Sequence, residues 1–463
     1  MVRSIWMTHL HKKQPGLIDE HCQVSYGELQ TRIDTAVESW RKWTGQPVGV
    51  IVNQSVEAAM VMLILMEAGI SFLPIDIHQT AAEIFTVKEI SGITEWIVPT
   101  HADYTRLQEV LGASEVCDYQ KVMHGEVPLR PETASVNPTA PCLFQLTSGS
   151  NGPTKVVKVP YDAVYEGGAL YAEWFGLTRK DNVLSSVPLH HSYGFIGALI
   201  GSLTAGSTVH LCPRPSPRKV ARMAEKKQCT VLFAVPLLYD LLGQAEVVRS
   251  EQLSSLRCTI SSGAALPPEV KERFSRKYGL RILQVYGSTE TGAIAATHPL
   301  REGSANAVGM ILPNVEVKET EDGRLAVKSK TLFTGYVSSE EEAIFTADSF
   351  YQTSDIGKVS DNEVFLMGRV SAFINVAGRK VDPAEIRSAL LGISRIKRVK
   401  VIGKTDLLYG QKILAFVEAE EDLTKEEILQ YLRPRLAPYK LPHEIRLNEE
   451  FPTEWKTTYI EIE

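Results

Sequence analysis

The chain has 463 residues, which at roughly 150 residues per domain excludes a small fold with a single core. Hydrophobic residues make up 44% and charged residues 22%, and both values are ordinary for a soluble globular protein. The net charge of −6, from 49 basic and 55 acidic side chains, argues against a nucleic-acid partner that needs a basic surface.

The cysteines and the first residues indicate the compartment. Six cysteines are scattered with no C-x-x-C pair, so we expect neither a structural zinc site nor a disulfide framework. The N-terminus reaches His9, His11 and Lys12 without an apolar signal core, and the longest apolar run, 58–66, is too short to span a membrane. These features predict a cytoplasmic protein with no membrane span.

Strands and helices alternate through most of the chain. Residues 48–52 predict a buried strand, followed by Ser55 as an N-cap and a helix that Gly69 ends. The pattern returns with strands at 143–146, 230–235, 257–260 and 281–286 and helices at 237–242 and 267–278. Such alternation predicts an α/β fold with parallel sheets, whose ligands bind at the carboxyl ends of the strands.

The pattern changes in the last third of the chain. Short strands at 315–317, 324–327 and 363–366 predict a small antiparallel β subdomain. Beyond Gly368, a helix that starts at 382–385, strands at 397–403 and 412–418 and a helix at 425–436 predict a small α+β unit. We therefore expect a large N-terminal domain at 1–368, a hinge at 369–372 and a C-terminal domain at 373–463.

A loop rich in glycine and hydroxyl groups follows the strand at 143–146. It runs Thr147-Ser148-Gly149-Ser150-Asn151-Gly152-Pro153-Thr154-Lys155. Glycines let backbone N–H groups turn toward an anion, hydroxyls donate hydrogen bonds and the lysine adds positive charge. The spacing does not match a Walker A box, so the loop by itself leaves a phosphate site and a plain surface loop equally open.

Four further motifs follow this loop along the chain, and they favour the phosphate site over a plain surface loop. They are Tyr286-Gly287-Ser288-Thr289-Glu290, Tyr351-Gln352-Thr353-Ser354-Asp355, Gly368-Arg369, and the stretch from Ile374 through Gly378 to Ile386. Through these motifs and the loop, the chain resembles the adenylate-forming enzymes, which include acyl- and aryl-CoA synthetases, nonribosomal peptide adenylation domains and luciferases. The resemblance is greatest to acyl-CoA synthetases and covers nearly the whole chain.

The resemblance implies a two-step reaction. A carboxylate attacks the α-phosphate of ATP to give an acyl-adenylate and pyrophosphate, and a thiol then displaces AMP to give a thioester. It implies that Thr147, Ser148, Gly149, Ser150, Asn151, Gly152 and Lys155 hold the phosphates, that Thr289 binds the α-phosphate and that Glu290 binds Mg²⁺. Asp355 would bind the ribose, Arg369 the ribose or a phosphate, and Gly263, Ala264, Tyr286 and Gly287 would complete the nucleotide site.

The segment Leu189-His190-His191-Ser192-Tyr193 bears on the acid. His191 matches the histidine that acyl- and coumarate-type CoA ligases place at the acyl pocket, while a capping or core role is the alternative for either histidine. The segment offers no carboxylate for a substrate ammonium, and a buried ammonium without a partner is costly, which disfavours an α-amino acid. We expect a fatty or other hydrophobic acid, with an aromatic acid as the alternative.

The C-terminus departs from the family pattern. Residues 451–458 read FPTEWKTT, so Lys456 is the candidate for the family's adenylation lysine, although the glycine before it is absent. The resemblance also implies a mobile C-terminal domain that supplies Lys456 and then rotates to admit a thiol beside Gly378.

The resulting expectation is a monomeric or homodimeric acid–thiol ligase that uses ATP, Mg²⁺ and CoA. One alternative is aryl-acid loading onto the phosphopantetheine of a carrier protein. The other is a non-catalytic adenylate- or acyl-binding protein, because of the altered lysine motif and of Ser371 at the hinge.

Overall fold

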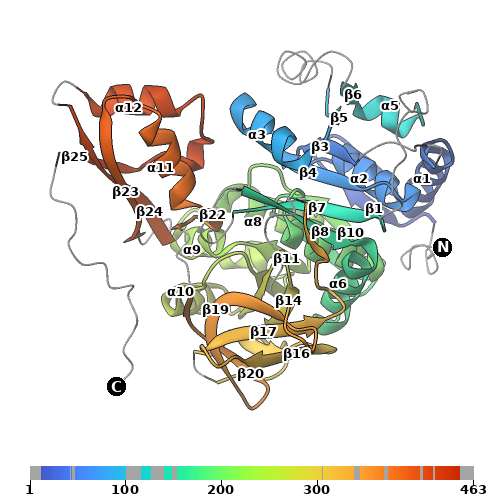
Figure 1. The fold of residues 1–463 in the computed structure, drawn as a ribbon. Helices are drawn as coiled ribbons and strands as arrows, with labels where there is room; N and C mark the ends of the chain where they lie inside the picture. The colour runs from blue at the N-terminus through green and yellow to red at the C-terminus, as the bar shows by residue number, and fades with distance from the viewer. Residues whose placement is uncertain are drawn as a thin grey trace.

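A large and a small lobe make up the molecule (Figure 1). The computed structural model describes residues 12–41, 43, 47–100, 116–126, 140–148, 154–304, 306–337, 345–369, 374–406, 410–420 and 423–448. The small lobe, drawn in red, comprises the described residues from 374 onward and lies beside the helix α3 (Ala81–Ser91) of the large lobe. No helix in these ranges is both long and apolar enough to cross a membrane.

The largest sheet of the described chain runs through the middle of the large lobe. Its strands are β1 (Pro15–Ile18), β2 (Gln23–Ser25), β9 (Asn182–Ser185), β10 (Thr208–Leu211), β11 (Val231–Ala234), β12 (Cys258–Ser261), β13 (Ile282–Ser288), β14 (Gly292–Ala296), β15 (Gly309–Ile311), β16 (Val315–Glu319), β17 (Arg324–Ser329), β19 (Tyr351–Ser360) and β20 (Glu363–Arg369). Their order is β16-β17-β19-β20-β15-β14-β13-β12-β11-β9-β10-β1-β2. From β1 through β10, β9, β11 and β12 to β13 the neighbours are parallel, and from β13 to β16 they are antiparallel.

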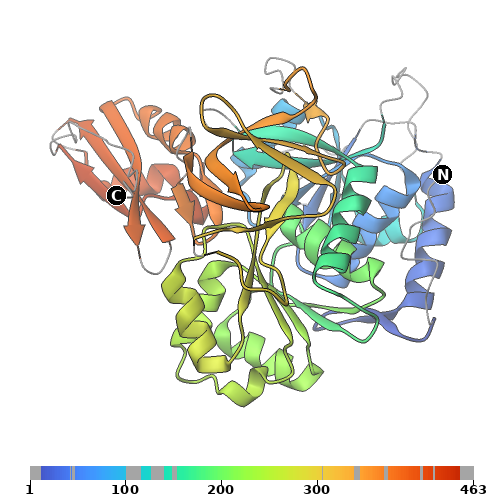
Figure 2. The same cartoon turned by 90° about the horizontal axis from the view of Figure 1, so that it is seen from below.

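Helices α8 (Pro217–Lys227), α9 (Pro236–Gln244) and α10 (Pro268–Tyr278) cover the parallel part and lie together outside the strands, in yellow-green in Figure 2. Helices α9 and α10 correspond to the predicted helices 237–242 and 267–278, whereas α8 was not predicted. The antiparallel strands were also predicted correctly. They do not form a separate sheet, however, because β14 pairs with the last parallel strand, β13, and extends its sheet.

A second sheet stands on the other side of the large lobe. Its strands are β3 (Val48–Val52), β4 (Phe72–Asp76), β5 (Glu95–Val98), β6 (Val116–Asp118), β7 (Cys142–Ser148), β8 (Thr154–Pro160) and β18 (Gly335–Tyr336), in the order β18-β8-β7-β4-β3-β5-β6. The short β18 lies in the chain between β17 and β19, two antiparallel strands of the large sheet, yet it pairs with β8. The chain therefore crosses between the two sheets at this point.

Further helices of the large lobe pack among these elements. Helix α1 (Tyr26–Trp40) begins at Ser25, and α2 (Val56–Ala68) has Ser55 as its N-cap and Gly69 (φ 75°) as its C-cap, as predicted. The apolar run 58–66 is a buried part of α2, which explains its length without any membrane. Helix α6 (Tyr161–Trp174) packs on the π-helix η2 (Tyr193–Ile200), which continues into α7 (Gly201–Thr204).

The small lobe has its own hydrophobic core. Strands β21 (Ile374–Val376), β22 (Arg379–Val381), β23 (Ile396–Asp406), β24 (Gly410–Ala419) and β25 (Glu444–Leu447) form one sheet, covered by α11 (Pro383–Leu391) and α12 (Lys425–Leu432). The predicted α+β unit is confirmed. The predicted helix 425–436 is too long, because α12 ends at Leu432 and a short 3₁₀ helix, η4 (Pro438–Lys440), follows it.

One buried histidine on β10 makes stability depend on pH. Burial lowers the pKa of His210 to about 4, and its Nε2 lies 3.3 Å from Asn182 Oδ1. The unfolded chain takes up a proton at this site below its pKa of about 6.5, whereas the folded chain does not until about pH 4. Stability from this group is therefore complete above the unfolded pKa and is lost as pH falls toward the folded pKa.

We expect His210→Gln to reduce the pH dependence of unfolding. Between pH 7.5 and 5.5 the variant should lose about 1 kcal/mol less stability than the parent chain, since one pH unit below the unfolded pKa corresponds to roughly 1.4 kcal/mol. Thermal unfolding at the two pH values measures the difference. His21→Gln, at an exposed position, is the matched control, and equal pH slopes for both variants would contradict the assignment.

Candidate active site

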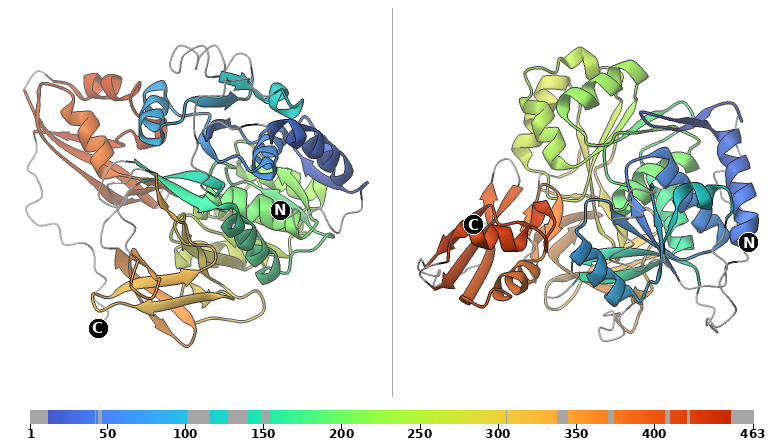
Figure 3. Two further views of the ribbon diagram at one scale, coloured as in Figure 1. Left: turned by 45° about the vertical axis from the view of Figure 1, so that its right-hand side comes forward. Right: turned by 90° about the horizontal axis from the view of Figure 1, so that it is seen from above.

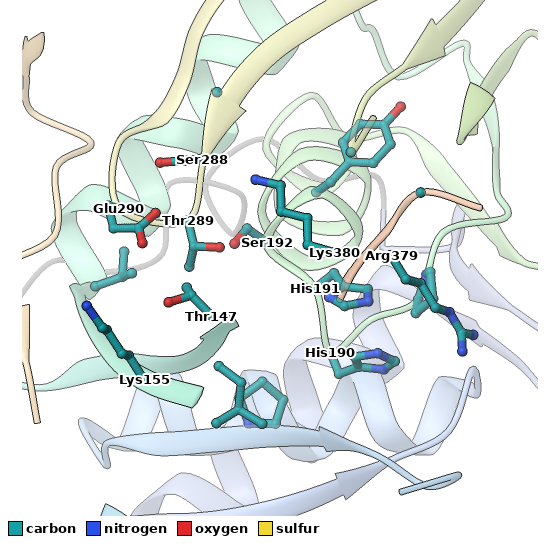
Figure 4. A pocket seen from close by; sticks show the side chains of 18 of the residues that line it. Thr147, Lys155, His190, His191, Ser192, Ser288, Thr289, Glu290, Arg379 and Lys380 are labelled. Carbon is teal, nitrogen blue, oxygen red and sulfur yellow. The ribbon is translucent and has the colours of Figure 1, made fainter. Parts of the chain in front are cut away.

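One cavity of about 950 Å³ lies where the two sheets and the small lobe meet. Its walls come from α3, from the hairpin of β7 and β8, from α6 and η2, from the β13–β14 turn, from β19 and from the β21–β22 turn. Figure 4 shows Thr147, Lys155, Thr289 and Glu290 on one side of it and His190, His191 and Arg379 on the other. The carboxyl ends of the parallel strands β4, β11, β12 and β13 thus face the cavity, as the fold class predicts.

The loop rich in glycine and hydroxyl groups connects the two strands of a hairpin, β7 and β8. Thr147 on β7 pairs directly with Lys155 on β8, and both side chains line the cavity. Thr147 Oγ1 is buried and has no hydrogen-bond partner among the described residues. A buried hydroxyl without a partner is costly unless a ligand satisfies it, so the hairpin is suited to hold a polar group in the cavity.

A positive and a negative side chain, Lys155 and Glu290, lie near each other in the cavity. Lys155 Nζ lies 5.0 Å from the centre of the Tyr336 ring, and burial lowers the pKa of Lys155 while the negative charge of Glu290 opposes that shift. Glu290 lies in the turn after β13, whose geometry leaves no room at Gly287: a β-carbon there would stand 2.1 Å from the carbonyl oxygen of Gly292. The motif therefore needs its glycine to bring Thr289 and Glu290 into the cavity.

Asp355 on β19 is a buried carboxylate of the site. It is 5% exposed and lines the cavity, and its Oδ2 accepts a hydrogen bond of 2.7 Å from the Tyr286 hydroxyl. Tyr286 itself does not line the cavity, and from behind Asp355 its hydroxyl orients the carboxylate. Arg369 stands opposite Asp355 in the antiparallel pairing of β20 and β19.

The adenine segment is brought to the site only in part. Gly263 lines the cavity with φ 86°, whereas Ala264, which follows it, does not line it. A β-carbon at Gly263 would stand 3.8 Å from the Gly378 carbonyl oxygen of the small lobe. Because glycine has no side chain, position 263 leaves space in the cavity where the two lobes meet.

Two histidines stand side by side in the cavity. The ring centres of His190 and His191 are 4.2 Å apart, and His190 Nε2 lies 3.7 Å from Asp76 Oδ2 at the end of β4. Burial lowers the pKa of His190 to about 3 and places the pKa of His191 well below its usual value. Both rings are therefore neutral near pH 7 and can accept or donate hydrogen bonds without carrying charge.

The small lobe contributes the β21–β22 turn. Gly378 has φ 84°, and its N–H donates a hydrogen bond of 3.0 Å to Asn375 Oδ1, which stabilises the turn. The backbone of Gly378 faces Val235. The Arg379 guanidinium stacks on Tyr439, 4.3 Å from the ring centre. Gly378 is thus placed at the cavity wall, as expected.

Several cavity residues were not predicted from the sequence. They are Asp76, Glu83, His190, Thr331, Lys380, Tyr439 and Lys440. Asp76 could have been found, because it ends a buried strand that belongs to the parallel set. Glu83, Tyr439 and Lys440 carry no motif, and only the folded chain brings them together.

Some predicted residues fall outside what the structure describes. They are the loop residues Gly149, Ser150, Asn151 and Gly152, the hinge from 370 to 372, and Lys456. Ser148 and Arg369 are described as strand backbone only.

The sequence matches models of known protein families over most of its length. Residues 8–337 match the AMP-binding enzyme family, and residues 385–455 match the AMP-binding enzyme C-terminal domain. A malonate–CoA ligase of Arabidopsis thaliana is 29% identical over 471 residues, covering 90% of this chain and 77% of the relative. A 4-chlorobenzoate–CoA ligase of an Arthrobacter species is 26% identical over 479 residues, covering 96% and 91%.

A solved structure extends the likeness to the whole fold. It is a malonyl-CoA ligase in a ternary product complex with methylmalonyl-CoA and AMP bound, with a TM-score of 0.83 at 25% identity. The alignment covers 96% of this chain and 98% of that one.

Proposed function

This chain belongs to the AMP-binding enzymes and is an ATP-dependent, AMP-forming CoA ligase, and we propose that the acid it activates has a compact, uncharged tail. The single observation that carries this proposal is the lining of the cavity between α6 and η2. Its residues there are Ala163, Gly167, Tyr171, Ile196, Ala293 and Thr331, none of which is charged. A second carboxylate or a sulfonate on the substrate would lose its hydration without meeting a cation in this part of the cavity.

The part of the cavity between α6 and η2, which we call the tail pocket, is also short. A β-carbon at Gly167 would stand 2.8 Å from Ile196 Cγ2 and 3.9 Å from Thr331 Cγ2, so these side chains close around the glycine. Tyr171 closes a further wall against Gly197, whose β-carbon would stand 3.0 Å from the ring. These contacts favour an aromatic or short aliphatic acid. The expectation of a fatty acid draws no support from the two named relatives, which are ligases of malonate and 4-chlorobenzoate.

The nucleotide would lie along the other side of the cavity. In this proposal Thr147 and Lys155 hold the phosphates, Thr289 approaches the α-phosphate and Asp355, oriented by Tyr286, accepts hydrogen bonds from the ribose. The buried hydroxyl of Thr147 and the lysine beside it support the phosphate assignment. His191, neutral and next to the tail pocket, would orient the acid's carboxylate.

A magnesium ion fits the donor set at Glu290. Mg²⁺ commonly takes one or two protein carboxylates and completes its shell with phosphate oxygens and waters, and Glu290 offers one carboxylate on the wall that Lys155 shares. When bound, the ion would neutralise charge on the phosphates. The protein's own part is to hold the carboxylate in the turn that Gly287 and Gly292 make possible.

The division of labour between the lobes is part of the proposal. We assign residues 1–368 to the binding of ATP and the acid, 369–372 to a hinge and 373–463 to a mobile lobe that presents Lys456 and then Gly378. The small lobe's separate core supports its movement as one body. The side of the cavity toward α3 reaches Arg435 and Tyr439, and we propose that the pantetheine thiol of CoA enters there.

Acid-dependent ATP–pyrophosphate exchange tests the proposal. The panel consists of benzoate, 4-chlorobenzoate, hexanoate, palmitate, malonate and phenylalanine, with CoA added afterwards to score thioester formation. We expect benzoate, 4-chlorobenzoate or hexanoate to give the fastest exchange. Exchange that is fastest with malonate or palmitate would refute the assignment of the tail pocket.

A variant of the tail pocket gives a second test. Gly167→Val should reduce exchange with aromatic acids at least tenfold, because the added methyl groups enter the space against Ile196 and Thr331. Exchange with acetate, which needs no tail pocket, should fall much less. Glu173→Val, exposed on the same helix, is the matched control, and an equal loss for aromatic acids and acetate would argue against this wall.

A further inference from the structure

A buried carboxylate on α3 connects the two lobes. Glu83 is 7% exposed, and its Oε2 accepts hydrogen bonds from Thr80 N at 2.9 Å and Thr80 Oγ1 at 3.0 Å, which caps the helix. Its other oxygen, Oε1, accepts the backbone N–H of Ala437 at 2.9 Å and the ammonium of Lys440 at 3.0 Å. One side chain thus serves the start of its own helix and a segment 354 residues further along the chain.

Lys440 ties this contact to the rest of the small lobe. Its Nζ also lies 2.8 Å from Glu385 Oε1 in the first turn of α11, and the residue is 8% exposed. Its neighbour Tyr439 carries the stacked guanidinium of Arg379, next to Gly378 in the β21–β22 turn. These contacts connect α3, through Lys440 and Tyr439, to the turn that lines the cavity.

The position of this contact relates it to the second half of the reaction. Glu83, Glu385, Tyr439 and Lys440 all line the cavity. Figures 1 and 3 show the small lobe seated against α3, and in this pose Gly378 stands against Val235. The proposed function assigns Gly378 to the entry of the thiol, so this pose is the one expected for thioester formation.

We propose that Glu83, together with Lys440 and the Ala437 N–H, forms a clamp that holds the small lobe in the thioester-forming pose. This inference rests on the proposed two-step function. Glu83 is a positioning residue here, since it acts on the reaction by fixing where Gly378 and Arg379 stand. When the lobe leaves, both charges regain water, so the attraction in the closed pose is largely offset by desolvation and the clamp can open.

Glu83→Gln isolates this role. Glutamine also fits the third position of a capping box, so its carbonyl oxygen keeps the Thr80 contacts. Its amide group then replaces Oε1 and presents two donors to the Ala437 N–H and the Lys440 ammonium, which are donors themselves. The helix start is preserved while the contact between the lobes is lost. Glu89→Gln, exposed on the same helix, is the matched control.

The test compares the two half-reactions with a structural readout. With the panel acid that gives the fastest exchange, ATP–pyrophosphate exchange of Glu83→Gln should stay within about twofold of the parent. Thioester formation after CoA is mixed with the enzyme-bound adenylate should fall about tenfold or more, the effect expected for lost hydrogen bonds to charged groups. Hydrogen exchange of the 436–441 backbone, read by mass spectrometry, should become faster, and Glu89→Gln should change none of the three.

Each outcome bears on the clamp or on the function separately. Unchanged thioester formation, or an equal fall in both half-reactions, would overturn the clamp. If the parent chain exchanges pyrophosphate with no acid, the proposed function fails. In that case the hydrogen exchange of 436–441 still decides the clamp: faster exchange in Glu83→Gln supports the contact and unchanged exchange refutes it.

Discussion

Replacing Lys456 by alanine is expected to reduce acid-dependent ATP–pyrophosphate exchange about 10²-fold, the usual effect of losing one oriented charge in an active site. Residues 451–458 resemble the family's terminal lysine motif, and Lys456 is the candidate for its lysine. In the pose described above, the small lobe presents Gly378 and Arg379 to the cavity. We propose that the lysine acts in a separate, adenylating pose.

The second half-reaction is the internal control for this variant. Thioester formation from a preformed acyl-adenylate and CoA should proceed in Lys456→Ala at close to the parent rate, because the proposed function assigns this step to the pose with Gly378 at the cavity. Lys425→Ala, exposed on α12 of the same lobe, should leave both half-reactions unchanged. Pyrophosphate release at the parent rate in Lys456→Ala would remove the lysine from the site.

Gly378→Val is expected to produce the opposite pattern, with thioester formation reduced about 10²-fold and exchange close to normal. A β-carbon at Gly378 would stand 3.3 Å from Val235 Cβ, so a branched side chain has no room when the lobe is in the described pose. Its φ of 84° also lies in the region that β-branched residues avoid. The turn would then fail to seat against the cavity.

Backbone strain alone has to be separated from this effect. Gly410→Val carries the same kind of strain, since Gly410 has φ 73° in the same lobe, but Gly410 does not line the cavity. We expect Gly410→Val to lower thermal stability without separating the half-reactions. Equal thioester rates in Gly378→Val and Gly410→Val would show that the position of Gly378 has no special role.

Local sequence signals predicted much of the fold because each acts over a few residues. Ser55 and Gly69 delimit α2 through a side-chain cap and a left-handed turn, and the β-branched run 48–52 is a buried strand as expected. The antiparallel strands were predicted as well, but not their union with the parallel sheet. That union depends on the pairing of β13 with β14, which is set by the tight turn around Gly287 and Gly292.

The site residues were likewise predicted where they belong to local motifs. Thr147, Lys155, Glu290, Asp355 and Gly378 sit in recognisable motifs and line one cavity. Tyr286 shows the limit of such motifs, because the sequence places it next to the site while the fold turns it behind Asp355.

Glu83 shows the opposite limit. In the sequence it reads as an ordinary capping residue for α3, which it is, and nothing nearby predicts Ala437 or Lys440 as its partners. Contacts of this range depend on how separate lobes come together, and patterns over a few residues do not record that.

The shared use of the Glu83 carboxylate affects how fast the lobes can exchange poses. Because Thr80 holds one oxygen whether or not the small lobe is present, the other oxygen is already aimed when Ala437 and Lys440 arrive. No rotamer has to be frozen on docking, so the conformational entropy lost at each encounter is small. Because the Glu83 side of the clamp is preorganised in this way, the clamp can form and open once per catalytic cycle without slowing turnover.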